Sequence, residues 1–169
     1  MHRFGFRSLL LFFVVISPFA RAQSADDVSS TLVVNRVVTQ ADGKETKEPA
    51  KTAKPGDLLE YVAEYRNTGK TPAKKLEATL PIPSGTEYVP DSAKPAGAWA
   101  SLDGNTFEPM PLKRKVKQTD GKLVEELIPY VEYRFLRWPA QDLPAGQSLK
   151  YSVRAKLPAE PATTGTPTK

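Results

Sequence analysis

The chain has 169 residues, of which 40% are hydrophobic and 25% charged, and it carries a formal net charge of +5. This length accommodates one ordinary domain with tails, and two domains are not expected. Because cysteine is absent and the only histidine is His2, the composition excludes disulfide bonds, cysteine nucleophiles and zinc sites built on these residue types.

The first 22 residues match the pattern of a secretory signal peptide. Arg3 and Arg7 form a basic start, residues 9–16 are an apolar run, and Ala20-Arg21-Ala22 is a small-residue cleavage pattern. A membrane anchor would need about 20 apolar residues, and here charged residues and a proline interrupt the run. We expect cleavage after Ala22 and export, with the periplasm as the destination and secretion or cell-surface display as alternatives. No transmembrane segment is expected in the mature chain.

Cleavage changes both the charge and the chemistry of the chain. Three arginines leave with residues 1–22, so the formal charge falls from +5 to +2, and His2 leaves as well. The remaining basic residues mostly alternate with acidic ones, so no nucleic-acid partner is expected. Without histidine or cysteine the mature chain lacks the usual catalytic bases and nucleophiles. We therefore expect no enzyme, no cofactor and no metal site.

Alternating apolar and polar residues recur along the mature chain, which is typical of strands with one face in a core. Residues 23–30 are expected to be a flexible segment, residues 40–54 a polar loop, and residues 158–169 a disordered Pro/Thr-rich tail. The pattern predicts strands at residues 31–39, 58–66, 74–80, 87–89, 98–102, 113–117, 130–138 and 148–157.

Two of these segments have the clearest alternation. In residues 58–66 one face holds Leu59, Tyr61, Ala63 and Tyr65, and in residues 148–157 every second residue from Leu149 onward is apolar. No segment shows a capped helical stripe over three turns. The sequence therefore predicts an all-β, immunoglobulin-like antiparallel β-sandwich of about seven or eight strands over residues 31–157.

Short turn motifs separate the predicted strands. Gly85 and Gly146 are expected to adopt positive φ angles, and the other motif residues are expected to shape turns before and after strands. These turn and fold motif residues are Gly56, Asp57, Asn67, Gly69, Pro83, Gly85 and Gly146.

The spacing of these motifs resembles the bacterial "conserved repeat" surface domain, the domain of unknown function numbered eleven. The resemblance rests on Lys54-Pro55-Gly56-Asp57 with Asn67-Thr68-Gly69, on Pro83-Ser84-Gly85, and on Leu143-Pro144-Ala145-Gly146. It implies an immunoglobulin-like sandwich in an envelope or surface protein, where such domains often repeat in tandem. An aspartate common before the Pro-x-Gly turn is missing here, and the single copy favours an accessory or binding module over a stalk.

Two groups of residues are candidates for an interaction surface. Trp99 and Trp138, with Tyr130 and Tyr133, could line a face for sugar or peptide, although for Trp138 a place in the core is the favoured interpretation. The basic run of Lys113, Arg114, Lys115 and Lys117 could contact anionic lipid or polyanionic glycan. Its favoured interpretation is an edge strand whose lysines prevent aggregation.

These observations predict a non-enzymatic, exported envelope protein, a structural or protein-binding module of the periplasm or cell surface. The expected partner is another envelope protein, because a sandwich offers strand edges and loop clusters for binding. The alternative is a carbohydrate- or glycan-binding module that uses exposed tryptophan and tyrosine. That alternative requires at least one of Trp99 and Trp138 to be exposed.

Overall fold

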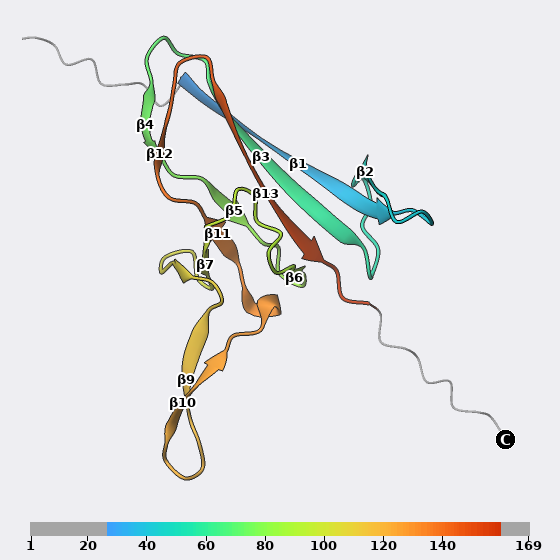
Figure 1. The fold of residues 1–169 in the computed structure, drawn as a ribbon, viewed down its shortest axis with the longest axis vertical. Helices are drawn as coiled ribbons and strands as arrows, with labels where there is room; N and C mark the ends of the chain where they lie inside the picture. Colours follow the sequence, from blue (N-terminus) through green and yellow to red (C-terminus); the bar gives the residue numbers. More distant parts are fainter. Residues whose placement is uncertain (1–26, 160–169) are drawn as a thin grey trace, which may run out of the picture.

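The computed structural model describes residues 27–159. They fold mostly into strands, whose antiparallel sheets pack together as an all-β sandwich, so the predicted fold class is confirmed (Figure 1). The expected signal peptide, residues 23–26 of the expected flexible segment and residues 160–169 of the expected tail lie outside the described residues.

The larger sheet has five strands in the order β2-β1-β3-β13-β6. They are β1 (Val28–Thr39), β2 (Glu45–Pro49), β3 (Leu58–Asn67), β6 (Glu87–Tyr88) and β13 (Ser148–Lys156). The long strands β1, β3 and β13 give this sheet its length, with β3 in the middle, paired to β1 on one side and to β13 on the other. β3 and β13 are the two segments with the clearest alternation in the sequence.

The second sheet has four short strands in the order β5-β11-β7-β8. They are β5 (Thr79–Pro81), β7 (Trp99–Ser101), β8 (Glu108–Pro109) and β11 (Phe135–Arg137). Because β11 lies between β5 and β7, residues distant in sequence come into direct register on this sheet.

Two smaller ribbons complete the described fold. β4 (Ala73–Leu76) pairs with β12 (Gln141–Leu143), and β9 (Lys113–Lys117) pairs with β10 (Leu123–Leu127) as a hairpin. A short 3-10 helix, η2 (Tyr130–Glu132), follows the hairpin. In Figure 1 the β9–β10 hairpin extends away from the packed sheets.

The core lies between the five-stranded and the four-stranded sheets. Alternate residues of β3 and β13 point into it, and in register they stack as Leu59 with Ala155, Tyr61 with Val153 and Ala63 with Tyr151. The four-stranded sheet adds buried residues from its inner face, among them Leu80, Ala100 and Leu136. Because both sheets contribute every second residue, the period-two pattern of the sequence is the direct cause of this core.

Several predicted elements have different bounds in the structure. β1 begins at Val28, inside the segment expected to be flexible, and the predicted loop at residues 40–54 contains β2. Residues 74–80 form two strands rather than one, β4 and β5, which are separated at Glu77 and Ala78. Residues 130–138 hold η2 before β11 rather than one central strand.

The structure also divides the fold into more strands than the seven or eight expected. Thirteen are present within residues 27–159, and the unpredicted ones are β2, β8, β10 and β12. These are short, and none shows a clean alternation of buried and exposed residues. They pair through backbone hydrogen bonds at sheet edges or in ribbons, and hydrophobic patterning does not reveal such pairing.

Asn67 is the most heavily bonded of the predicted turn residues. Its side chain is fully buried, and Nδ2 donates to the carbonyl oxygens of Thr71 at 2.8 Å and Leu143 at 2.9 Å. Its Oδ1 accepts from Gly69 N–H at 2.9 Å. Asn67 therefore ties the end of β3 to the following turn and to the end of β12.

The glycines of the motifs have two different roles. Gly85 and Gly146 adopt φ angles of 82° and 72°, the positive values that the sequence predicts for these turns. Gly69 is required for space instead, because a Cβ built on it would lie 2.8 Å from side-chain atoms of Asp27.

Candidate functional site

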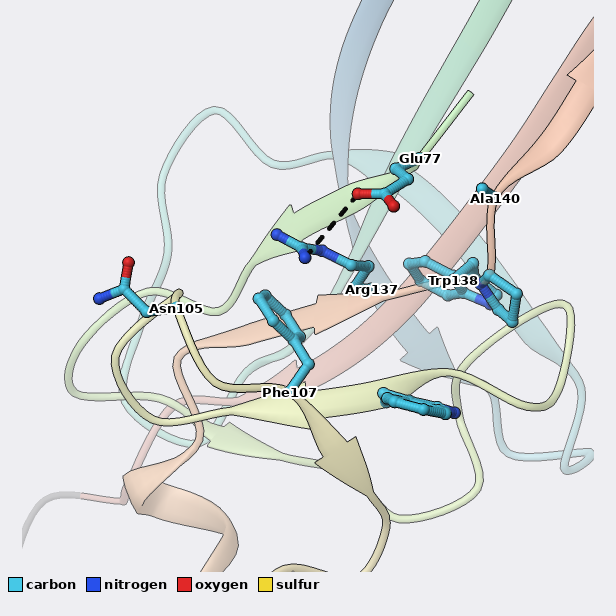
Figure 2. Close-up of a pocket in the computed structure, with 8 residues that line it drawn as sticks. Glu77, Asn105, Phe107, Arg137, Trp138 and Ala140 are labelled. Atoms are coloured by element: carbon cyan, nitrogen blue, oxygen red, sulfur yellow. Dashed lines mark ion pairs between the residues drawn. The ribbon is translucent and has the colours of Figure 1, made fainter. Parts of the chain in front are cut away.

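A hollow of about 370 Å³ opens beside the outer face of the four-stranded sheet (Figure 2). Its lining combines aromatic rings with both signs of charge, which can supply stacking and hydrogen bonds to one ligand. We call it the Trp99 pocket, and the residues that characterise it are Glu77, Trp99, Asn105, Phe107, Arg137 and Trp138.

Strand register brings the two central side chains of the pocket together. Arg137 of β11 is the direct partner of Trp99 on β7 and of Thr79 on β5. Directly opposed residues in an antiparallel sheet point to the same face. The adjacent positions on these strands are also paired with one another and point into the core; they are Leu136, Ala100 and Leu80. The pocket face is therefore the solvent side of the same strands that close the sandwich.

The guanidinium group of Arg137 is held in place by three contacts. It lies 3.8 Å from the centre of the Phe107 ring, and its Nε donates to Thr79 Oγ1 at 3.1 Å. Its Nη1 forms a long ion pair of 3.8 Å with Glu77 Oε2, the contact drawn as a dashed line in Figure 2. The Nη hydrogens of Arg137 make no hydrogen bond within residues 27–159. The guanidinium group is thus held in place while its Nη donors stay available to a ligand.

The loop between β7 and β8 is shaped by Asp103. Its Oδ1 accepts hydrogen bonds from Thr106 N–H at 3.0 Å, Asn105 N–H at 2.8 Å and Ser101 Oγ at 3.0 Å. The backbone donors of Thr106 and Asn105, followed by Ser101, lower the pKa of Asp103 below its ordinary value. This loop carries Asn105 and Phe107 to the pocket.

The order of this loop is expected to depend on pH. When folding lowers the pKa of a carboxyl group, the group stabilises the fold at pH values above its ordinary pKa. This contribution is lost as the pH falls through the lowered pKa of the folded state. NMR titration of the amide signals of Asn105 and Thr106 should therefore give a midpoint below the ordinary aspartate range. In the Asp103→Asn variant the acid-induced shift should disappear. A midpoint at or above the ordinary aspartate value would contradict this assignment.

The two tryptophans have different environments. Trp138 is only 2% exposed, packs against Tyr151 with ring centres 4.9 Å apart and ring planes tilted by 48°, and donates from its indole nitrogen to Pro95 O at 2.6 Å. It is a core residue that forms one wall of the pocket. Trp99 is 47% exposed, so its ring is free to contact a ligand.

The two tyrosines proposed as part of an aromatic face do not join the pocket. Tyr133 is buried and stacks on Tyr88 with ring centres 5.8 Å apart, while its hydroxyl accepts a hydrogen bond from Leu112 N–H at 2.7 Å. Tyr130 packs edge-on against Tyr88 and Tyr133. This cluster anchors the base of the β9–β10 hairpin and is part of the core.

Sequence reasoning missed Arg137, Phe107 and Glu77 as pocket residues. Arg137 is the polar residue of a short strand, and Phe107 lies in a loop without periodicity, so neither has a local signal. Only the pairing of β11 with β7 and β5 shows that they meet. The basic run lies elsewhere, on the hairpin, and none of its residues lines the Trp99 pocket.

A second charged group lies on the outer face of the five-stranded sheet. The carboxylate of Glu60 is nearly buried, and it pairs with Lys47 Nζ at 2.6 Å and more distantly with Arg154 Nε at 3.7 Å. Arg154 is itself held by Glu45 through two hydrogen bonds. Glu60 is covered because β2 supplies Lys47, which lies over its carboxylate.

Neither a metal centre nor a membrane helix is found in the described part of the chain. No group of three or more His, Cys, Asp or Glu residues is placed to hold a metal ion within residues 27–159. In the same residues no helix has the length and apolar character needed to cross a membrane.

Comparison with known proteins gives no relative for this arrangement. No family model matches the sequence, and no curated protein or solved structure matches it significantly. The resemblance to the conserved-repeat domain therefore stays a prediction that rests on the motifs alone.

Proposed function

We propose that the chain is a non-enzymatic, exported protein of the bacterial envelope that binds a segment of another envelope protein in the Trp99 pocket. The observation that carries the proposal is the fixed guanidinium of Arg137 beside the half-exposed ring of Trp99. Tryptophan and arginine are the side chains most enriched among residues that dominate the energy of protein interfaces. An immunoglobulin-like sandwich is the scaffold that we infer for it.

Preorganisation supports this function. Binding is weakened when long side chains must be ordered on contact. Here Phe107, Thr79 and Glu77 already hold Arg137, and the hydrogen bonds of Asp103 already order the loop that carries Phe107. The pocket can therefore bind a planar or anionic group of a partner with little rearrangement.

Replacement of the pocket residues should remove the partner without unfolding the chain. We expect Trp99→Ala and Arg137→Gln each to reduce capture of the partner from envelope extract at least tenfold, since truncation of a central interface residue costs about 2 kcal/mol or more. The measurement is quantitative affinity capture with the chain from residue 23 onward. Val33→Ala, an exposed site on the other sheet, is the matched control. Equal capture by all variants would contradict the proposal.

A glycan is the second candidate ligand for the same pocket. The half-exposed Trp99 ring lies in one hollow with Glu77, Arg137 and Asn105, and a sugar can stack on an aromatic ring while its hydroxyls bond to such polar groups. Because Trp99 is far more exposed than Trp138, a saccharide stacked on Trp99 should change mainly the fluorescence of Trp99. A saturable change in the native chain that is absent from Trp99→Phe would favour this candidate over a protein partner.

A further inference from the structure

The β9–β10 hairpin carries the most exposed apolar side chains of the described chain next to a row of lysines. β9 and β10 pair with each other and with no other strand in residues 27–159. Figure 1 shows them extending beyond the packed sheets. Leu123 is 66% exposed and Leu127 is 60% exposed. This surface is separate from the Trp99 pocket.

The register places the lysines and leucines on one face. Lys117 is directly opposite Leu123, and Lys113 is directly opposite Leu127. Lys115, between the two lysines, is opposite Glu125. Directly opposed residues share a face, and so do alternate residues of one strand. We call this the lysine–leucine face; its members are Lys113, Lys115, Lys117, Leu123, Glu125 and Leu127.

Arg114 does not belong to this face. It is opposite Glu126 on the other side of the hairpin, and its Nη1 pairs with Glu132 of η2 at 3.1 Å. The basic run predicted as one surface is thus divided by the pleat of the strand. Arg114 fixes the hairpin to the body of the molecule, and the three lysines remain as the cationic row.

The face keeps a net positive charge, because three lysines share it with one acidic residue, Glu125. Lys113 forms a long, exposed contact of 3.4 Å with Glu125. Lys115 and Lys117 make no ion pair within the described residues. Protection of a strand edge against aggregation explains the exposed lysines. It does not explain why two leucines of the same face are more than half exposed.

We propose that the lysine–leucine face docks onto an anionic lipid bilayer. Interfacial segments combine basic side chains with large apolar ones, because the apolar groups enter the acyl boundary while the cations meet lipid phosphates. Leu123 and Leu127 supply the first component, and the row of three lysines supplies the second. The hairpin that carries these residues projects beyond the packed sheets (Figure 1).

Vesicle flotation tests this proposal with the chain from residue 23 onward. Vesicles of phosphatidylcholine with about 30% phosphatidylglycerol are compared with vesicles of phosphatidylcholine alone at low and physiological salt. We expect at least tenfold stronger partitioning onto the anionic vesicles, reduced by salt. Lys113→Gln, Lys115→Gln and Lys117→Gln combined should lower it by on the order of 100-fold, because each lysine near such a surface contributes about fivefold.

Further variants separate the two components and control for net charge. Leu123→Ser with Leu127→Ser should remove the part of the binding that survives raised salt. Replacement of three exposed lysines elsewhere, Lys51, Lys54 and Lys70, by glutamine removes equal charge and should leave partitioning within twofold of the original. Soluble glycerol phosphate at millimolar concentration should not displace the chain from vesicles.

Four results would overturn the proposal. They are equal partitioning onto neutral and anionic vesicles, absence of binding to both, displacement by soluble glycerol phosphate, and equal losses in the hairpin and control lysine variants. The variants must retain the thermal unfolding midpoint of the original chain. Because the hairpin residues are exposed, a shift of no more than about 2 °C is expected.

Discussion

Asn67→Ala is expected to destabilise the chain by about 3 kcal/mol, which lowers the thermal unfolding midpoint by roughly 10 °C. The substitution removes the side-chain bonds to Thr71 O, Leu143 O and Gly69 N–H. The backbone groups left behind are partly or fully buried, and an unsatisfied buried group costs about 1–3 kcal/mol. Unfolding monitored by circular dichroism measures the change.

Two variants define what the result means. Asn67→Asp keeps an acceptor for Gly69 N–H but has no donor for the two carbonyl oxygens, so its stability should also fall clearly below that of the native chain. Asn105→Ala removes an exposed turn asparagine whose side chain makes one weak contact of 3.5 Å, and it should change the midpoint by less than about 2 °C. Similar midpoints for Asn67→Ala and Asn105→Ala would show that Asn67 does not hold the turns together.

Trp138→Ala is expected to cost about 3–5 kcal/mol, the range for removal of a large buried aromatic side chain. The indole fills space against Tyr151, and its N–H satisfies Pro95 O. Trp138→Phe keeps most of the ring volume and loses the hydrogen bond, so its cost should be smaller, about 1–2 kcal/mol. Chemical denaturation with two independent probes measures both variants.

Trp99→Ala is the natural comparison, because it removes the same side chain from the opposite side of one pocket. With 47% of Trp99 exposed, its loss should cost under about 1 kcal/mol. We therefore expect Trp138 to contribute mainly to stability and Trp99 mainly to binding. Equal destabilisation by the two substitutions would contradict this division.

The parts of the fold that sequence reasoning predicts are those where burial on one face imposes a period of two. β3 and β13 carry that pattern in Leu59, Tyr61 and Ala63 and in Tyr151 and Val153, and the structure buries all five. The burial of Trp138 follows from its size and from its place at the end of a strand. For these elements the local pattern and the tertiary packing agree.

The parts that it misses depend on pairing between distant segments. β2 has almost no apolar residue, and it forms because its backbone pairs with β1 while Lys47 reaches Glu60. A break at Glu77 and Ala78 divides a segment whose alternation suggests one continuous strand. Turn chemistry and edge pairing of this kind leave no periodic signal in one sequence.

The candidate site is predictable only in part for the same reason. Trp99 could be identified as a candidate interaction residue, but its exposure and its neighbours Arg137 and Phe107 depend on the strand order β5-β11-β7-β8. Likewise, the basic run is visible in the sequence, while its division between Arg114 and the three lysines requires the register of β9 with β10.

Site-specific photocrosslinking in the bacterial envelope directly tests whether the Trp99 pocket is the binding surface of the chain. A photoreactive phenylalanine derivative is placed at Trp99 or at Val33, which is comparably exposed on the other sheet. We expect a discrete adduct from position 99 that is absent from position 33 and is lost when Arg137→Gln is added. The mass of the adduct distinguishes a protein from a glycan. No adduct at position 99, or the same adducts at both positions, would contradict the account.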